Sequence, residues 1–173
     1  MQILLGLGGN LGDVPAAFAA AAAAIGRRFR VLGCSGLWSS APVGPPQPEF
    51  ANAALLVDAD IDPLRLLAFA QRLEAEAGRD RRAVARFGPR TLDIDLLLAR
   101  DVVIESPALT LPHPRLAKRR FALLPAAELV PAWIHPRLHR TVADLSVSAA
   151  VAGQPCRRAG PFPAAVPPAR APR

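Results

Sequence analysis

The segment at residues 86–100, which reads RFGPRTLDIDLLLAR, limits the fold of this chain more than any other. Apolar residues alternate with Asp93 and Asp95 and then run on without interruption, which is the pattern of a strand that enters a buried sheet. Residues i and i+2 of a strand lie on the same side of the sheet, about 6.5 Å apart. Because aspartate is uncommon in strands, we interpret this pair as a functional feature of one sheet face.

Two neighbouring carboxylates repel each other unless a positive charge offsets them. Mg²⁺ accepts one or two carboxylates and completes its shell with waters and phosphate oxygens, and five arginines lie within residues 79–90. We therefore predict that Asp93 and Asp95 bind magnesium beside a phosphorylated substrate. The alternative is a pair of solvated aspartates on the wet face of a strand, which the adjoining arginines and apolar run disfavour.

The net charge of +7 is unevenly distributed along the chain. Residues 79–90 and 154–173 together carry +8, so the remaining residues sum to −1. A surface that binds RNA or DNA also needs stacking aromatic side chains, but the arginine loop contains only Phe87 and the chain has no tyrosine. We therefore expect no nucleic-acid partner.

The chain of 173 residues is about one domain long. Turn and capping residues predict three strands and two helices before the aspartate strand, at residues 2–7, 13–26, 30–40, 50–57 and 62–77. The order β, α, β, β, α, β is typical of the α+β class. It predicts a ferredoxin-like α/β sandwich, with a mostly antiparallel sheet and helices packed on one face of it.

The second half of the chain gives weaker signals. Residues 102–105 are predicted to form a hairpin partner of the aspartate strand, and residues 114–130 to form short helical pieces interrupted by Pro125. We expect one domain at residues 1–153. Residues 154–173 are rich in proline and arginine and are predicted to be a disordered tail.

Several other classes of protein are disfavoured. Cys34 and Cys156 are too few for a disulfide framework and lack the spacing of metal ligands. A dinucleotide-binding fingerprint fails at Leu11, and a Walker loop fails because Lys118 is the only lysine. The apolar run at residues 14–25 is too short and too rich in alanine to span a membrane. We expect a cytoplasmic protein without a membrane partner, and we also expect a monomer.

The remaining signals favour phosphoryl-type transfer from a nucleotide, which requires mainly positioning and neutralisation of charge. Paired aspartates, an arginine loop and His113, which is restrained between two prolines, supply both. Two alternatives stay open at this point. One is a ferredoxin-like nucleic-acid-binding module, and the other is a different magnesium-dependent nucleotidyl or phosphoryl transferase.

A resemblance to a known family narrows the choice. The segment RFGPRTLDIDLL resembles the signature of the 6-hydroxymethyl-7,8-dihydropterin pyrophosphokinases of folate biosynthesis. Four further segments are similar to that family in the same order: GLGGNLGD, SAPVGPPQPEFANAAL, QRLEAEAGR and LTLPHPRLAKRRFAL. The resemblance covers about residues 2–136.

The resemblance implies an enzyme that uses magnesium, with two ions, to move the pyrophosphoryl group of ATP onto the hydroxymethyl group of the pterin, releasing AMP. It assigns catalytic roles to Arg79, Arg82, Arg90, Asp93 and Asp95, with the two aspartates as metal ligands. It assigns the nucleotide site to Gln71, Glu74, Arg82, Arg90, His113 and Arg119. It assigns the pterin site to Ser40, Ala41, Val43, Phe50, Asn52 and Phe121.

The chain departs from the family at some of these positions. Phe50 stands where tyrosine is common, Phe87 where tryptophan is common, and Ala41 where proline is common. The arginine loop is one residue longer than usual. Alignment from the glycine at residue 78 makes Arg79 the first catalytic arginine, whereas alignment from the glycine at residue 88 leaves Arg81 and Arg82 competing for the role.

Overall fold

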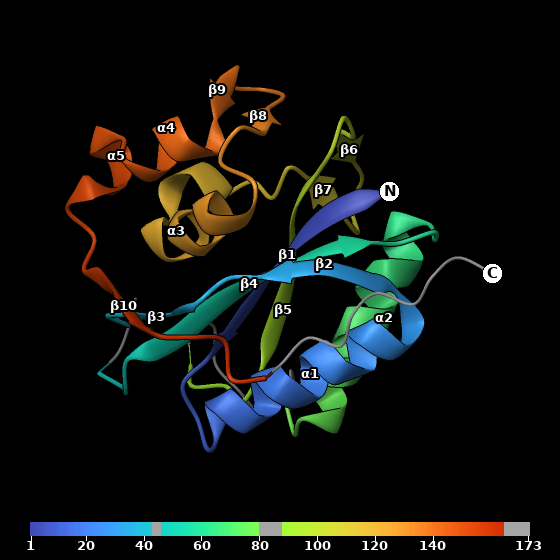
Figure 1. Cartoon of the computed structure of the whole chain (residues 1–173), viewed down its shortest axis with the longest axis vertical. Helices are drawn as coiled ribbons and strands as arrows, with labels where there is room; N and C mark the ends of the chain where they lie inside the picture. Colours follow the sequence, from blue (N-terminus) through green and yellow to red (C-terminus); the bar gives the residue numbers. More distant parts are fainter. Residues whose placement is uncertain (43–45, 80–87, 165–173) are drawn as a thin grey trace.

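The computed structural model describes residues 1–42, 46–79 and 88–164. Its centre is a six-stranded sheet in the order β10-β3-β4-β1-β5, and β2 also pairs with β4 (Figure 1). Every pairing in this sheet is antiparallel, as the sequence predicts. The strands are β1 (Gln2–Gly9), β2 (Arg30–Cys34), β3 (Leu37–Ser40), β4 (Phe50–Asp58), β5 (Asp93–Ala99) and β10 (Cys156–Gly160).

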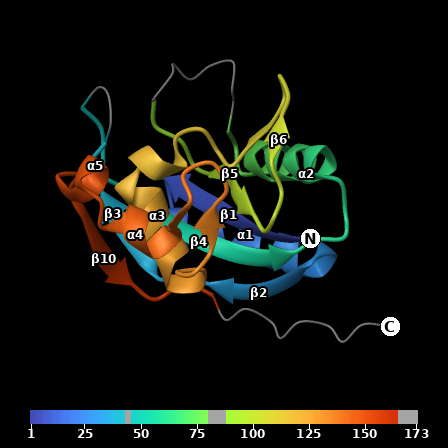
Figure 2. The same cartoon turned by 90° about the horizontal axis from the view of Figure 1, so that it is seen from above.

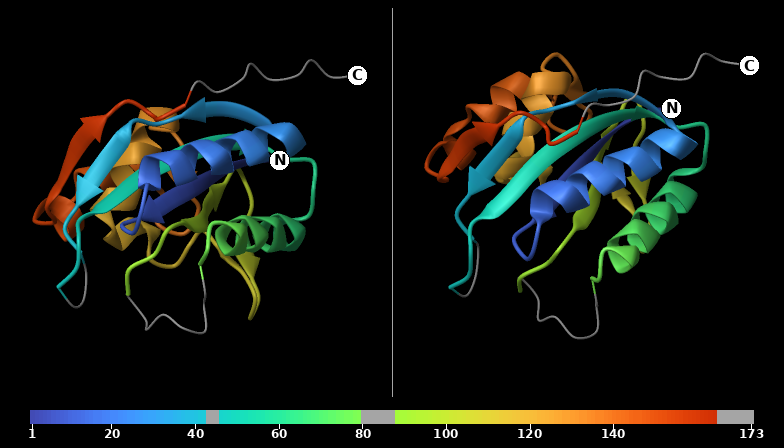
Figure 3. Two further views of the ribbon diagram at one scale, coloured as in Figure 1. Left: turned by 90° about the horizontal axis from the view of Figure 1, so that it is seen from below. Right: turned by 60° about the horizontal axis from the view of Figure 1, so that its bottom comes forward.

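Two helices cover one face of the sheet, α1 (Val14–Arg28) and α2 (Pro63–Glu76), which lie beside each other in Figure 3. The core on this face contains Leu5, Phe18 and Leu66, all almost fully buried. The chain order β1, α1, β2 and β3, β4, α2, β5 is that of a split βαβ sandwich, so the predicted ferredoxin-like fold is confirmed.

A second helical layer covers the opposite face (Figure 2). It consists of a 3₁₀ turn, η1 (Leu116–Lys118), and the helices α3 (Arg120–Leu129), α4 (Val142–Ser146) and α5 (Ala149–Ala152). Leu4 and Leu97 of the sheet pack against Leu123 of α3 in a separate core. The prediction of helices on one face was therefore incomplete, because the C-terminal third of the chain buries the other face.

The helix ends follow the capping residues in the sequence. The Asp13 side chain accepts a hydrogen bond from the Ala16 N–H at 3.0 Å, and Asp62 accepts one from Leu64 at 2.8 Å. Gly78, at φ +83°, follows α2 as predicted. Gly26 does not end α1, because Phe29 closes that helix in an extended conformation, which requires no glycine.

Three local predictions need correction. The strand expected at residues 30–40 is broken into β2 and β3 at Ser35. The Ser35 Oγ accepts the Ala54 N–H at 2.8 Å, so this backbone donor of β4 keeps a hydrogen-bond partner at the break. Pro125 lies inside a continuous α3, since losing one N–H leaves the other hydrogen bonds of the helix intact. Residues 102–105 pair with the aspartate strand only through the bridge between Ala99 and Val102.

The short strands after β5 form two separate hairpins. β6 (Ile104–Glu105) pairs with β7 (Thr110–Leu111), and β8 (Ile134–His135) pairs with β9 (Arg140–Thr141). An ion pair between Arg137 and Glu105 connects the two hairpins. The β8–β9 hairpin lies beside α4 of the second layer (Figure 1), whereas Leu109 and Leu111 of the β6–β7 hairpin are buried in the core on the α1–α2 side of the sheet.

The prediction of a disordered tail from residue 154 is wrong for its first part. β10 extends the sheet by pairing with β3, and Arg157 forms an ion pair with Glu49 at 2.8 Å. The prolines at residues 155, 161 and 163 flank this strand and leave Cys156–Gly160 free of proline, so its N–H groups remain available for pairing. Residues 165–173 lie outside the described part of the chain.

Both cysteines are free thiols, as expected, and burial raises the pKa of the Cys34 thiol to about 12. In the described residues, the helices are too short or too polar to cross a membrane. The cytoplasmic location expected from the sequence stays a prediction.

Glu128 of α3 should contribute measurably to stability. Its carboxylate accepts hydrogen bonds from the Gly36 N–H and the Trp38 Nε1–H, both at 2.8 Å, and lies 3.4 Å from Arg158 Nε. We expect Glu128→Ala to lower the free energy of unfolding by about 1–3 kcal/mol, because it removes two hydrogen bonds that each contribute about 0.5–1.5 kcal/mol. Urea denaturation followed by tryptophan fluorescence measures the change. Glu76→Ala, at an exposed position on α2, is the control, and equal losses in the two variants would contradict this role.

Candidate active site

A pocket of about 510 Å³ opens between the sheet and the second helical layer. Strands β1, β4 and β5 form its floor, and η1 with the start of α3 forms one wall. Nine predicted site residues line it: Ser40, Ala41, Phe50, Asn52, Arg90, Asp93, Asp95, Arg119 and Phe121. The sequence segments that carry these residues are far apart, and the sheet order brings them to one place.

Asp93 and Asp95 lie on the same face of β5, as the two-residue period predicts, and both face this pocket. The residues paired with them on β1 are Gly8 and Gly6, which carry no side chain over the floor. A Cβ atom at Gly6 would lie 2.9 Å from Leu97 Cδ1, closer than packed atoms tolerate. Glycine at this position therefore keeps the floor open beside the carboxylates.

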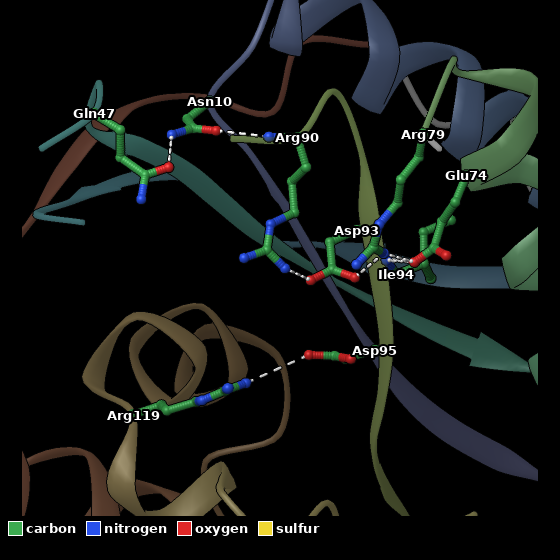
Figure 4. A network of polar contacts seen from close by, with 9 residues as sticks. All are labelled: Asn10, Gln47, Glu74, Arg79, Arg90, Asp93, Ile94, Asp95 and Arg119. Atoms are coloured by element: carbon green, nitrogen blue, oxygen red, sulfur yellow. Dashed lines mark hydrogen bonds and ion pairs between the residues drawn. The ribbon is translucent and has the colours of Figure 1, made fainter. Parts of the chain in front are cut away.

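Both oxygens of Asp93 are engaged by arginines (Figure 4). Arg79 pairs with Oδ1, and Arg90 Nη1 donates to Oδ2 at 2.7 Å. Burial raises the pKa of the Asp93 carboxyl, but the charges of these two arginines outweigh that effect and leave the pKa below its ordinary value. Asp93 is therefore held in its ionised form.

Asp95 has a different environment from its neighbour. Burial is the main cause of its raised pKa, and the negative charge of Asp93 acts in the same direction. Among the described residues it forms an ion pair with Arg119, whose Nη1 lies 3.5 Å from Oδ2. His113 also interacts electrostatically with Asp95, although burial lowers the pKa of the imidazole and favours its neutral form. His113 itself does not line the pocket.

Glu74 lies behind the pocket, with about 1% of its surface exposed. Its Oε1 accepts the Ile94 N–H at 2.7 Å and also pairs with Arg79 Nη1 at 2.6 Å. β5 is the last strand in the sheet order, so no neighbouring strand accepts the outward N–H of Ile94, and the Glu74 carboxylate accepts it instead. Glu74 therefore fixes the backbone between the two aspartates. Gln71 is exposed on α2 and does not line the pocket.

Asn10 ties three loops together around Arg90 (Figure 4). Its Oδ1 accepts the Arg90 N–H at 2.9 Å, and its own N–H donates to the Arg90 carbonyl at 2.9 Å. Its Nδ2 donates to Gln47 Oε1 at 3.0 Å and to the Pro48 carbonyl at 3.1 Å. The sequence indicated only a turn at this asparagine.

Four predicted pterin residues, Ser40, Ala41, Phe50 and Asn52, line the pocket from β3, β4 and the residue after β3, and Phe121 lines it from α3. Asn52 is 4% exposed, and its Nδ2 donates to Ser40 Oγ at 3.0 Å and to the Phe50 carbonyl at 3.2 Å. The guanidinium carbon of Arg90 lies 5.3 Å from the centre of the Phe50 ring, and that of Arg119 lies 5.5 Å from the centre of the Phe121 ring. The two aromatic rings are thus each held beside a cation.

Comparison with known proteins identifies the family. Residues 4–131 match the family model described as 7,8-dihydro-6-hydroxymethylpterin-pyrophosphokinase (HPPK). The chain belongs to the HPPK family. It is 38% identical over 144 residues to a 2-amino-4-hydroxy-6-hydroxymethyldihydropteridine pyrophosphokinase from Synechocystis, which covers 82% of this chain and 73% of that protein.

Further relatives agree with this membership. A protein of the same name from Pseudomonas aeruginosa is 38% identical over 133 residues, covering 75% of this chain and 81% of that one. The crystal structure of Plasmodium falciparum HPPK-DHPS with pteroate has a TM-score of 0.66 at 15% identity, which shows a shared fold. The match covers 84% of this chain but only 41% of the Plasmodium chain.

The pocket of this HPPK chain also contains residues that the sequence analysis did not assign. Arg115, just before η1, and Lys118, within it, line the pocket, and Gln154 lines it from the turn before β10. The two basic residues belong to the segment LPHPRLAKRR, next to the predicted His113 and Arg119. Their position in the sequence could therefore have identified them as pocket residues. Gln154 lies beyond the resemblance, and no sequence signal indicated it.

Some predicted residues of this HPPK chain cannot be located in the pocket. Val43, Arg82, Arg81 and Phe87 lie outside the described residues. Arg79 pairs with Asp93. Because Arg81 and Arg82 lie outside the described residues, the assignment of the catalytic loop arginine among these three stays open.

The opposite pKa shifts of the two aspartates predict opposite effects on stability. Because the pKa of Asp95 is raised, ionisation of its carboxyl lowers the stability of the folded protein. This cost is absent below the ordinary aspartate pKa and reaches its full size above the pKa in the folded state. A lowered pKa means that ionised Asp93 contributes stability, which is lost as the pH falls through its folded-state pKa. At pH 7 in EDTA, we expect Asp95→Asn to raise the Tm and Asp93→Asn to lower it.

Thermal unfolding between pH 3 and pH 8 tests this pair, and each variant serves as the control of the other. Both differences from wild type should shrink toward the acidic end of the range, where protonation removes the charge on the wild-type carboxyls. Shifts of the same sign at pH 7 would show that these electrostatic environments are wrongly assigned.

Proposed function

We propose that this chain transfers the pyrophosphoryl group of ATP to 6-hydroxymethyl-7,8-dihydropterin in folate biosynthesis. The hydroxymethyl oxygen bonds to the β-phosphorus while the bond from that phosphorus to the α–β bridging oxygen breaks, so AMP leaves and the pterin diphosphate forms. Family membership supports this reaction. The observation that carries it is a carboxylate pair on the floor of one pocket, between a cationic wall and two phenylalanines.

Asp93 and Asp95 would hold magnesium. In the described part of the chain, no group of three or more histidine, cysteine or acidic side chains is placed to bind a metal by itself. Two adjacent carboxylates suit Mg²⁺, which takes its remaining ligands from water and phosphate, and the family resemblance implies two ions. Bound magnesium would neutralise charge that builds up on the transferred phosphates.

The cationic residues would bind the triphosphate. Among the described residues, the pocket lining contains two acidic side chains against Arg90, Arg115, Lys118 and Arg119, which leaves a surplus of two positive charges for an anion. Arg79, Arg82 and His113 are proposed to complete the nucleotide side, together with Gln71. Glu74 would act on this side through Arg79 and the Ile94 N–H, because it is buried.

The apolar side would bind the pterin. A flat ring would stack against Phe50 and Phe121, while the amide of Asn52 and the segment containing Ser40, Ala41 and Val43 would meet its edge. We propose that a monomer is sufficient, because one chain brings the two carboxylates, the cationic wall and both phenylalanines together, as a single domain that includes β10.

The product of the reaction distinguishes this function from its rivals. We expect incubation with ATP, Mg²⁺ and the hydroxymethyl dihydropterin to give AMP and the pterin diphosphate, separated by anion-exchange chromatography. Release of inorganic pyrophosphate would indicate a nucleotidyltransferase instead. A nucleic-acid-binding module would give no turnover and would bind RNA or DNA with an affinity that collapses in salt.

Removal of one metal ligand should abolish most activity. We expect Asp95→Asn to lower kcat/KM about 100-fold or more, since it removes part of a stabilisation worth several kcal/mol in the transition state. Steady-state kinetics at saturating Mg²⁺ measure the loss. Asp101→Asn, an exposed aspartate after β5, is the matched control and should retain full activity. Equal activities in the two variants would refute the role of Asp95.

Phe121 should act on the pterin more than on ATP. Aromatic stacking contributes about 0.5–1.5 kcal/mol beyond area burial, so we expect Phe121→Ala to weaken pterin binding by about three- to tenfold or more. Isothermal titration calorimetry with each ligand measures both affinities, and Phe121→Leu controls for loss of side-chain volume. Equal losses for ATP and pterin would contradict this assignment.

A further inference from the structure

The junction between η1 and α3 carries residues for both halves of the proposed site. Arg119 pairs with Asp95, and two residues later Phe121 lines the pterin side. Arg119 is also the N-cap residue of α3, yet its side chain makes no capping hydrogen bond. The first N–H groups of a helix have no partner within the helix and need one from elsewhere. A side chain committed to the pocket therefore leaves α3 without a local cap.

Gln154 supplies that cap from a distant part of the chain. Its Oε1 accepts the Arg120 N–H at 2.9 Å, and its Nε2 donates to the Lys118 carbonyl at 2.9 Å, so one amide spans the junction. The contact is reciprocal, because Arg120 Nη1 donates to the carbonyls of Ala152 at 2.9 Å and Gln154 at 3.2 Å. Arg120 thus holds the C-terminal segment, and Gln154 holds the junction.

We infer that Gln154 is a positioning residue that orients Arg119 and Phe121 toward the pocket by capping α3 in place of Arg119. Gln154 lies beyond residue 131, where the match to the family model ends. The segment from α5 to β10 therefore serves the site and does more than extend the sheet. This role rests on the proposed function, since it is defined by the two substrates.

Three variants separate positioning from general stability. Gln154→Leu has a similar size and loses both hydrogen bonds, whereas Gln154→Glu keeps the acceptor for the Arg120 N–H. Arg158→Gln is the matched control, because it weakens another link between β10 and α3 that lies outside the pocket lining. Measurements of KM for ATP and for the pterin, kcat and Tm are made on the full chain.

We expect Gln154→Leu to raise both KM values about five- to tenfold, as the loss of one or two hydrogen bonds would, with kcat changed less than twofold. Gln154→Glu should return both KM values to within about threefold of wild type, since its carboxylate still caps the helix. Arg158→Gln should lower the Tm and leave both KM values unchanged. Unchanged KM values in Gln154→Leu, or equal increases in Arg158→Gln, would overturn the inference.

Amide hydrogen exchange distinguishes failure of this inference from failure of the proposed function. In the protein without ligands, Gln154→Leu should speed exchange of the Arg120 N–H about tenfold, and Gln154→Glu should restore its protection. A wild-type protein that forms no AMP would refute the proposed function, while this exchange rate would still decide whether Gln154 caps α3. An unchanged rate in Gln154→Leu would refute the cap.

Discussion

Three carboxylates meet at the start of β5, and their mutual repulsion is the constraint on which the site depends. Glu74 is almost fully buried, whereas the side chains of Asp93 and Asp95 remain 21% and 38% exposed. Arg79 is shared between Glu74 and Asp93, and Arg90 holds the other oxygen of Asp93. Removing Arg79 would take a cation away from the almost fully buried Glu74 carboxylate, and breaking a buried ion pair in this way costs several kcal/mol. The arginines are therefore part of the fold before they meet any substrate.

This arrangement gives the two aspartates unequal roles despite their identical chemistry. Asp93 is saturated with guanidinium contacts, whereas Asp95 has one longer contact to Arg119 and a raised pKa. The difference arises from position along one strand, because each carboxylate meets a different wall of the pocket. Neighbouring like charges whose pKa values are pushed apart are a common feature of catalytic sites.

Local patterns predicted the parts of the structure that depend on near neighbours in the sequence. The two-residue period placed both aspartates on one face, and Asp13 and Asp62 marked the helix starts that the structure confirms. The backbone contacts of Glu74 and Gln154 could not be predicted, since their partners lie 20 and 34 residues away and have no sequence signature. The strand β10 was missed because the surrounding prolines dominated the composition of that segment.

Asn10 shows how the surroundings of Arg90 are assembled from separate segments of the chain. A single side chain joins the turn after β1, the segment before β4 and the segment before β5. Arg90, positioned by that asparagine, contacts both Asp93 and the Phe50 ring. The cationic and aromatic halves of the site consequently share one anchor. A change at Asn10 would act on Arg90 and, through it, on both Asp93 and Phe50, so the two proposed ligand subsites depend on one amide.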